Sequence, residues 1–322
     1  MYKIIMAPTE GSETERAAIS MAVRLAQRFD AELRLVRVEN APGAPEAISS
    51  PTAYAATQHT LADARLARLH KLEALGTECR VMGGVRVVTD LENGVVTSTL
   101  RDYAKQFEVD LIVMSSHARG GFDRLTMGSV TDYLIRHAHV PVLVVKRPMA
   151  SEDGNPNQTF NRIVVPLDGS ALAERILPPV AALASRLNAT VSLLQVLTPL
   201  TYSQNQIMQP GLPWWDEDIA VANACLARAS SYLTEQGLSV SKDVVLSEHV
   251  PSAIRDYAVR ARADLIALAT SGAGGMGRFV FGSVADEVTR TSPTSLLVFH
   301  PASTAAQPDR AAEPPTELHQ PA

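Results

Sequence analysis

The sequence of 322 residues is long enough for about two domains. Its hydrophobic fraction of 46% and charged fraction of 20% are those of an ordinary globular protein. A net charge of −5 without a basic block argues against nucleic acid or an anionic membrane surface as a partner. The two cysteines fit no disulfide or metal pattern, and no apolar run is long enough for a signal peptide or a membrane span. We therefore expect a soluble cytoplasmic protein without a metal site.

The first part of the chain alternates short apolar runs with amphipathic segments. Residues 4–7 form an apolar run ending at Pro8, which indicates a buried strand. Helix-start residues Ser12 and Thr14 then precede apolar residues at helical spacing. The further elements expected are a strand over 33–38, a loop over 41–58, a helix over 60–75 capped by Gly76, a strand within 79–88, a helix over 95–107, a strand over 111–114, a helix over 129–137 and a strand over 141–145.

The pattern restarts after a polar segment that contains proline and glycine. The elements expected there are a strand over 163–165, a helix over 171–187, a strand over 191–196, a loop over 198–218, a helix over 219–236 capped by Gly237, a strand over 244–246, a helix over 252–262 and strands over 265–269 and 295–299. The proline-rich end of the chain lacks the apolar residues that a core needs. We therefore predict a domain over 1–147, a linker over 148–159, a second domain over 160–300 and a disordered tail over 301–322.

Two stretches of the chain, 110–145 and 264–299, share one layout of strand, glycine-containing loop, helix and strand. Gly128 and Gly282 are 154 residues apart, as are Asp110 and Asp264. Alternation of strands and helices favours a parallel sheet with helices on both faces. The predicted fold class is therefore α/β and Rossmann-like, with two copies of an open, mostly parallel five-stranded sheet.

Two loops in each half should form a ligand site. In an open parallel sheet, ligands bind beyond the carboxyl ends of the strands, where the strand order reverses. In the second half this edge would bring Asp168, after the first strand, close to the glycine loop and to the helix that begins at Gly282. The carboxylate can accept hydrogen bonds from a ribose or a base, while glycine-loop amides and a helix N-terminus attract phosphate. This combination suits a nucleotide.

These motifs resemble those of the universal stress protein family, in two tandem copies. Nucleotide-binding members carry Gly-x2-Gly-x9-Gly-Ser/Thr after the fourth strand and an aspartate after the first. The second half is similar, with Asp168 and the run Ala269-x2-Gly272-x9-Gly282-Ser283. The first half has Glu10 and the run Ser115-x2-Ala118-x9-Gly128-Ser129, which lacks two of the glycines.

The resemblance implies an adenine nucleotide alpha hydrolase-like fold, a role in stress response and ATP as the ligand, with or without Mg²⁺. The ligand contacts that it implies in the second half are Pro166, Leu167, Asp168, Val196, Gly272, Gly282, Ser283 and Val284. The corresponding, weaker set in the first half is Pro8, Thr9, Glu10, Val38, Gly128, Ser129 and Val130. The first site is expected to be weaker because Ala118 adds a Cβ where glycine would let the backbone approach phosphate.

Structural interpretations of the same residues stay open. Asp168 is also suited to an Asx-turn or a helix N-cap. Ser129 and Asp132, like Ser283 and Asp286, have the spacing of a helix-capping arrangement that needs no ligand.

Catalysis has little support in the sequence. It contains no phosphate-binding Gly-x4-Gly-Lys-Ser/Thr motif and no Gly-x-Ser-x-Gly nucleophile motif, so we assign no catalytic residue and expect any ATP hydrolysis to be slow. We expect a nucleotide-binding signalling protein whose halves pair through 141–145 and 295–299, and such tandem chains can dimerise further. The alternatives are a nucleotide-free scaffold that acts through protein contacts, and a nucleotide-dependent transferase or hydrolase.

Overall fold

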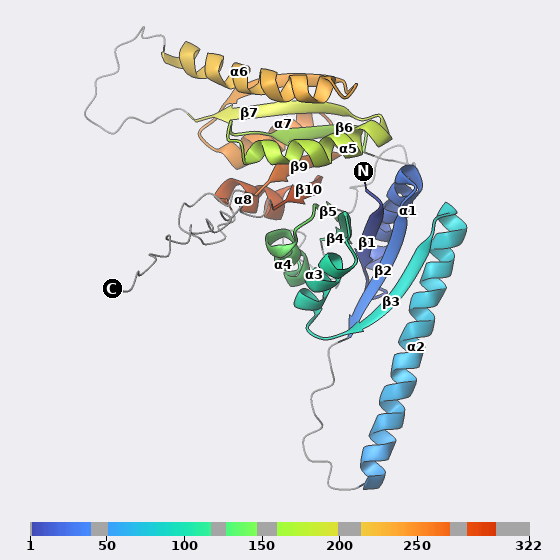
Figure 1. Cartoon of the computed structure of the whole chain (residues 1–322). Helices are drawn as coiled ribbons and strands as arrows, with labels where there is room; N and C mark the ends of the chain where they lie inside the picture. Colours follow the sequence, from blue (N-terminus) through green and yellow to red (C-terminus); the bar gives the residue numbers. More distant parts are fainter. Residues whose placement is uncertain are drawn as a thin grey trace, which may run out of the picture.

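A single ten-stranded sheet runs through the molecule (Figure 1). The computed structural model describes residues 2–39, 51–116, 127–146, 160–198, 214–270 and 282–300, with the backbone only for residues 51–61, 214 and 215. The strands are β1 (Ile4–Pro8), β2 (Glu32–Glu39), β3 (Val87–Asn93), β4 (Leu111–Ser115), β5 (Val142–Val145), β6 (Arg162–Pro166), β7 (Thr190–Leu197), β8 (Val240–Leu246), β9 (Leu265–Ala269) and β10 (Ser295–Phe299). Their order in the sheet is β3-β2-β1-β4-β5-β10-β9-β6-β7-β8.

The sheet consists of two five-stranded halves, β1 to β5 and β6 to β10. Within each half every neighbouring pair of strands is parallel. Two parallel strands that are joined in sequence need a connection that crosses over the sheet, and helices supply these connections here. The predicted α/β class with a mostly parallel sheet is therefore confirmed.

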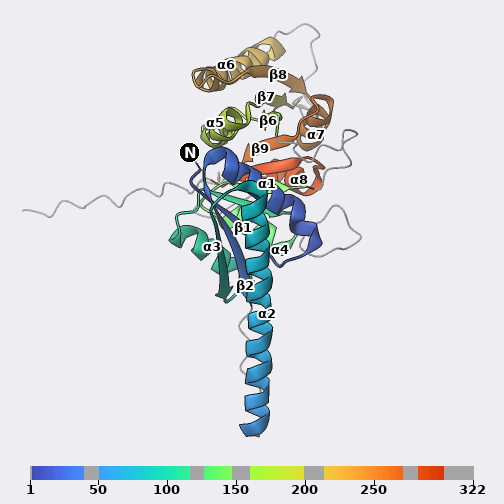
Figure 2. The same ribbon diagram turned by 90° about the vertical axis from the view of Figure 1, so that its right-hand side faces the viewer.

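The helices form one layer on each face of the sheet. They are α1 (Arg16–Phe29), α2 (Pro51–Gly83), α3 (Val96–Gln106), α4 (Ser129–His137), α5 (Leu177–Leu187), α6 (Trp214–Thr234), α7 (Val250–Arg260) and α8 (Ser283–Thr291), with short 3₁₀ turns η1 (Glu13–Glu15) and η2 (Ala173–Ile176). Buried side chains of α1, α2, α5 and α6 share one hydrophobic core, and those of α3, α4, α7 and α8 share the core on the other face. Figures 1 and 2 show α2 extending well beyond the strands of the first half.

The aspartate at the start of each repeated stretch has the same structural role in both halves. Asp110 Oδ2 accepts hydrogen bonds from the backbone amides of Lys3 (2.6 Å) and Ile4 (3.0 Å), at the start of β1. Asp264 Oδ2 accepts from the amides of Asn161 (2.9 Å) and Arg162 (3.0 Å), at the start of β6. Each aspartate therefore ties the beginning of the first strand of its half to the residue that precedes the fourth strand.

The two halves meet where β5 pairs with β10 in the antiparallel direction. Leu296 lies opposite Val144, and Val298 lies opposite Val142. All four residues of β5 are buried, as are the first four of β10. These apolar strands would be edge strands of the separate halves, with unpaired backbone groups, and the pairing satisfies both.

Four charged side chains connect α4 to α8 beside this strand pair. Arg136 Nη2 lies 2.6 Å from Asp286 Oδ1, and Arg290 Nη2 lies 3.3 Å from Asp132 Oδ1. Each arginine also pairs with the aspartate of its own helix, at 3.0 Å in both helices. Burial raises the pKa of the Asp286 carboxyl, but hydrogen bonds from Arg290 and Arg136 lower it by more, so the pKa lies below its ordinary value. We call Asp132, Arg136, Asp286 and Arg290 the interhelix charge cluster.

The charge cluster overturns one structural interpretation of the sequence. The N-cap residues of α4 and α8 are Gly128 and Gly282, and neither helix has a side-chain capping bond. The interpretation of Asp132 and Asp286 as capping residues was therefore wrong. Their carboxylates turn instead toward arginines one helical turn further on and in the other half, where each forms charge-assisted contacts with two guanidinium groups.

Lys146 and His300, which follow β5 and β10, occupy corresponding positions with different partners. Lys146 Nζ donates to the carbonyl oxygens of Thr289 (3.0 Å) and Ser292 (2.8 Å) at the end of α8, where the helix dipole favours a cation. His300 is buried, and its Nδ1 lies 2.6 Å from Oγ1 of Thr270. Burial lowers the pKa of both side chains, that of Lys146 to about 8.

The largest error of the sequence analysis concerns α2. A loop was expected over 41–58, but the helix begins at Pro51, since proline is favoured in the first helical turn and alanine is a strong helix former. Gly76 was expected to end the helix and 79–88 to contain a strand, but α2 continues to Gly83 and β3 begins at Val87. A Cβ at Gly76 would lie only 2.5 Å from Cγ2 of Thr89, so this glycine allows close packing of α2 on β3.

The beginning of α6 was also misplaced. The loop expected over 198–218 gives way to helix at Trp214, where Asp216 and Glu217 lie in the first turn and favour the helix N-terminus. The predicted linker and tail, like the loop residues 40–50, lie outside the described residues. Among the described helices, none combines the length and the apolar character that crossing a bilayer requires.

We expect Gly76→Ala to lower the free energy of unfolding by about 1–2 kcal/mol, because the added methyl group overpacks the contact with Thr89. Helix propensity alone would change the stability by about 1 kcal/mol in the opposite direction. In a Thr89→Ser background, which lacks Cγ2, the substitution should become neutral or stabilising. Urea unfolding of the four chains measures the coupling, and equal effects in both backgrounds would contradict the contact.

We expect Arg136→Ala to cost about 1 kcal/mol of stability, because it removes one of the two arginines that Asp132 and Asp286 share. Arg16→Ala is the control, since Arg16 and Glu13 form a surface pair with side chains 65% and 81% exposed, and it should cost under about 0.5 kcal/mol. The cost for Arg136→Ala should shrink in about 1 M salt, where the Debye length is roughly 3 Å. A salt-independent difference would show that charge is not what connects the helices.

The pH dependence of stability should report Lys146. Because its folded-state pKa of about 8 lies below the unfolded value of 10.5, the unfolded chain holds the extra proton between these pH values. The free energy of unfolding should therefore rise with pH across this window, by at most about 1.4 kcal/mol per pH unit. Burial raises the pKa of the Cys79 thiol to about 11, so titration of Cys79 makes the free energy of unfolding fall with rising pH. The quantity to measure is therefore the difference in slope between the unaltered chain and a chain without Lys146.

The variant for this measurement is Lys146→Met, which should lose the rise. Lys105→Met, at an exposed position in α3, should keep it. Chemical unfolding at several pH values from 8 upward checks both chains. Identical slopes in the Lys146→Met chain and the unaltered chain would contradict the assignment.

Candidate functional site

Each half has a cavity at the point where its strand order reverses. The reversal lies between β1 and β4 in the first half and between β6 and β9 in the second, because β2 and β3 extend to one side and β5 to the other. This is the edge at which open α/β sheets bind ligands. The cavity of the first half measures about 490 Å³ and that of the second about 220 Å³.

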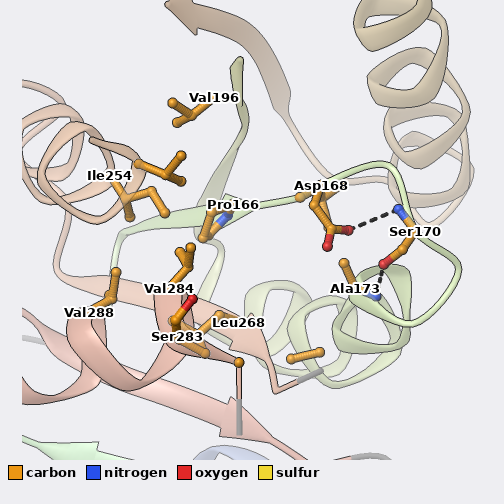
Figure 3. Close-up of a pocket in the computed structure, with 15 residues that line it drawn as sticks. Pro166, Asp168, Ser170, Ala173, Val196, Ile254, Leu268, Ser283, Val284 and Val288 are labelled. Atoms are coloured by element: carbon orange, nitrogen blue, oxygen red, sulfur yellow. Dashed lines mark hydrogen bonds between the residues drawn. The ribbon is translucent and has the colours of Figure 1, made fainter. Parts of the chain in front are cut away.

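The cavity of the second half is bounded by β6, β7, β9, α7 and α8, by the loop after β6 and by η2 (Figure 3). Its described lining consists of Pro166, Leu167, Asp168, Ser170, Ala173, Val196, Val250, Ile254, Leu268, Ala269, Gly282, Ser283, Val284, Ala285 and Val288. Most of these side chains are aliphatic, and Asp168 is the only ionisable one among them. An apolar cavity with a few convergent polar groups is the usual form of a small-molecule site.

The loop after β6 holds the carboxylate of Asp168 in a fixed position. Asp168 Oδ1 accepts a hydrogen bond from the amide of Ser170 at 2.9 Å, and Ser170 Oγ accepts from the amide of Ala173 at 3.1 Å (Figure 3). The Asx-turn interpretation of Asp168 is therefore confirmed. Asp168 Oδ2 has no hydrogen-bond partner in the described part of the chain, so the exposed carboxylate keeps one oxygen for a ligand.

Backbone donors lie near the cavity in the loop after β6 and at the start of α8. Gly169 adopts a φ of +81°, a conformation that suits glycine, and no described residue accepts a hydrogen bond from the amides of Asp168 or Gly169. Opposite this loop, α8 begins at Ser283, and the first amides of a helix have no partner within the helix. These donors, together with the helix dipole, make this end of the cavity suitable for an anion.

The cavity of the first half has the same frame and a different chemistry. Its described lining consists of Pro8, Thr9, Glu10, Glu15, Val36, Val38, Val95, Val96, Thr97, Leu100, Met114, Ser115, Gly128, Ser129, Val130 and Thr131. Two carboxylates, Glu10 and Glu15, replace the single one of the second half. Glu15 is only 5% exposed, and its position corresponds to that of Ala173.

The structure brings together nearly all residues that the sequence analysis selected as ligand contacts. Those that line the second cavity are Pro166, Leu167, Asp168, Val196, Gly282, Ser283 and Val284. Those that line the first are Pro8, Thr9, Glu10, Val38, Gly128, Ser129 and Val130. Gly272, and Ala118 in the first half, lie outside the described residues. Contact with a ligand stays a prediction for every one of them.

Two features of the cavities were missed by the sequence analysis. The first is the side wall from the helix before the fourth strand, which contributes Val250 and Ile254 in the second half and Val96 and Leu100 in the first. These pairs have the i, i+4 spacing of one helix face, a signal that also fits ordinary core packing. The second is Glu15, for which the available signal was the capping-box spacing Ser12-x-x-Glu15, a pattern that brings the glutamate back to the loop.

The sequence pattern that defines the universal stress protein family matches residues 1–146 and 159–300. The chain belongs to the universal stress protein family. The match covers both halves, so the resemblance noted from the motifs is confirmed in its tandem form.

Individual proteins agree with this membership. A universal stress protein of Methanocaldococcus jannaschii is 32% identical over 156 residues, which are 46% of this chain and 84% of that protein. A universal stress protein of Mycolicibacterium smegmatis is 25% identical over 309 residues, or 93% of this chain and 97% of that one. The crystal structure of a universal stress protein from Archaeoglobus fulgidus has the same fold, with a TM-score of 0.60, 19% identity and coverage of 92% of this chain and 98% of that one.

Some universal stress proteins similar to part of this chain were solved with adenine nucleotides. One is a complex with cAMP, and one, from Archaeoglobus fulgidus, is a complex with dAMP. They cover 45% and 44% of this chain at a TM-score of 0.33 each.

Proposed function

We propose that this universal stress protein binds an adenine nucleotide, ATP first among them, in the cavity of its second half, and signals through binding rather than turnover. The observation that carries the proposal is the arrangement around this cavity. In the described part of the chain, a carboxylate with one oxygen available, two loop amides without an acceptor and a helix N-terminus lie beside an aliphatic floor.

In this proposal each part of the nucleotide has a matching surface. The adenine ring lies against aliphatic side chains such as Leu167 and Val196, which favour an apolar, planar group. Asp168 accepts hydrogen bonds from ribose hydroxyls or from the adenine amino group. The phosphates lie at Gly282 and Ser283, at the start of α8, with Gly272 as a further contact. Mg²⁺, when present, is held mainly by phosphate oxygens and water, which suits a site with few carboxylates.

The lining of the cavity favours binding over catalysis. Asp168 is its only ionisable side chain in the described part of the chain, and a fast phosphoryl transfer uses cationic side chains together with a residue that orients the nucleophile. We therefore propose that the nucleotide controls the state of the protein, and that any hydrolysis is slow.

We further propose that the two halves act as a built-in dimer. The antiparallel pairing of β5 with β10 and the interhelix charge cluster support this proposal, since both lie between the halves. Dimerisation of the whole chain, a cytoplasmic location and a role in stress response stay predictions of the same proposal.

Calorimetric titration of the intact chain with ATP tests the nucleotide site, with cAMP and dAMP as further ligands. Asp168→Ala should weaken ATP binding at least tenfold, or about 1.4 kcal/mol, because it removes an acceptor at the cavity. Glu174→Ala is the matched control, because Glu174 lies on η2 near the same loop, pairs with Arg228 and does not line the cavity. Its affinity for ATP should stay within about threefold of the unaltered chain.

Nucleotide released from the purified chain by denaturation is a simpler first observation. Absence of saturable heat with ATP, cAMP and dAMP, together with absence of released nucleotide, would contradict the proposal and favour the nucleotide-free scaffold. Formation of ADP at the turnover rate of ordinary enzymes, about 1–1,000 per second, would contradict the proposal that the protein signals through binding rather than hydrolysis.

A further inference from the structure

The loops that follow β1 and β6 share a backbone turn but differ in whether a side chain accepts hydrogen bonds from their amides. Gly11 and Gly169 both have a φ of +81°, so the two loops turn in the same way at these glycines. In the second half, the amides of Asp168 and Gly169 find no acceptor in the described part of the chain. In the first half, the amides of Glu10, Gly11 and Ser12 all donate to the side chain of Glu15, and that of Gly11 donates also to Oγ1 of Thr9 at 3.0 Å.

Glu15 takes up the donors of its loop almost completely. Its Oε2 accepts hydrogen bonds from the amides of Glu10 (3.0 Å), Gly11 (3.2 Å) and Ser12 (3.3 Å) and from the hydroxyl of Thr9 (2.8 Å). A turn of successive amides is a site that attracts anions. Here the anion is part of the chain, which leaves no donor of this loop for a ligand.

The rest of the first cavity is also unfavourable for phosphate. Glu10 supplies a second carboxylate, and the described lining has no lysine, arginine or histidine. Arg37, the neighbouring cation, donates to the carbonyl oxygen of Glu10 at 2.8 Å and does not line the cavity. A polyphosphate at this loop would therefore meet the buried carboxylate of Glu15, a like charge in a partly enclosed space where charges are weakly screened.

The same cavity is well suited to an uncharged molecule with a planar base and a sugar. Its volume of about 490 Å³ lies within the range of small-molecule sites, roughly 300–1,000 Å³. Val36, Val38, Leu100 and Met114 supply an apolar wall, and the hydroxyls of Thr97 and Ser129 can pair with those of a sugar.

We propose that the first half binds a nucleoside without phosphate, and that Glu15 makes this selection by occupying the amides of the loop after β1. The inference rests on the proposed function only for the choice of adenine as the base. The chain would then have two unlike sites, one for a nucleotide and one for a nucleoside. Glu15 acts as a selectivity residue in this proposal, and its counterpart Ala173 leaves the second site open to phosphate.

Met114 allows the first cavity to be observed separately. It lines this cavity, is 7% exposed and has Leu268 at the corresponding position of the second. In the chain labelled with ¹³C-methyl methionine, the NMR signal of Met114 therefore reports on the first site. Comparison with Met114→Leu, which lacks it, assigns this signal. Adenosine should shift this signal saturably, and ATP should bind at least tenfold more weakly, about 1.4 kcal/mol.

In Glu15→Ala, which copies Ala173, ATP should bind the first cavity at least tenfold more tightly than in the unaltered chain, while adenosine changes less than threefold. The proposal is overturned if ATP shifts Met114 equally well in both chains. It is also overturned if neither ligand shifts Met114 in either chain. Thermal unfolding of each chain establishes that Glu15→Ala is folded at the temperature of the titration.

The reverse exchange tests the selection without altering the first loop. Ala173→Glu should weaken ATP binding to the second half at least tenfold, and Ala173→Gln, of similar size without the charge, should weaken it less than threefold. Equal losses would show that bulk is responsible and would overturn the role of the carboxylate. If the unaltered second half does not bind ATP, the proposed function fails, and the Met114 titrations still decide the inference for the first half.

Discussion

The pairing of β5 with β10 is the contact on which the rest of the molecule depends. It joins two parallel halves into one sheet and buries strands that consist almost entirely of aliphatic residues. It also fixes which helices become neighbours, since α4 precedes β5 and α8 precedes β10 on the same face. The outer edges of the sheet are then β3 and β8, which carry the polar and half-exposed residues expected of edges in contact with water.

This arrangement places the two cavities in one mechanical unit. Helices α4 and α8 begin at Gly128 and Gly282, at the cavities, and Asp132 and Asp286 lie one turn further along. Both aspartates pair with arginines of both helices, so a change in the direction of one helix alters ion pairs of the other. The two helices and their charge cluster therefore connect the two cavities through a continuous series of contacts.

The sequence was sufficient for the fold class, the repeat and about half of the described residues around the second cavity, because these depend on local patterns. Apolar runs, loop glycines and the recurrence of Asp110 as Asp264 are all visible in one chain. Contacts between distant residues were not predictable in the same way. Gly76 looks like a helix end and is instead the position where α2 touches Thr89, and Asp286 looks like a cap and instead pairs with Arg136 of the other half.

The difference between the two cavities shows why similar motifs do not make equivalent sites. The sequence analysis assigned the weakness of the first half to Ala118 and to Glu10 in place of aspartate. The structure adds a larger chemical difference, a buried carboxylate from Glu15 that holds the amides of its own loop. A side chain five residues from the motif position can occupy the donors that the motif provides, because the turn into α1 brings it back over the loop. The turn of the loop is therefore common to both halves. The halves differ in the acceptor of the loop amides, which is Glu15 in the first half and no described residue for Asp168 and Gly169 in the second.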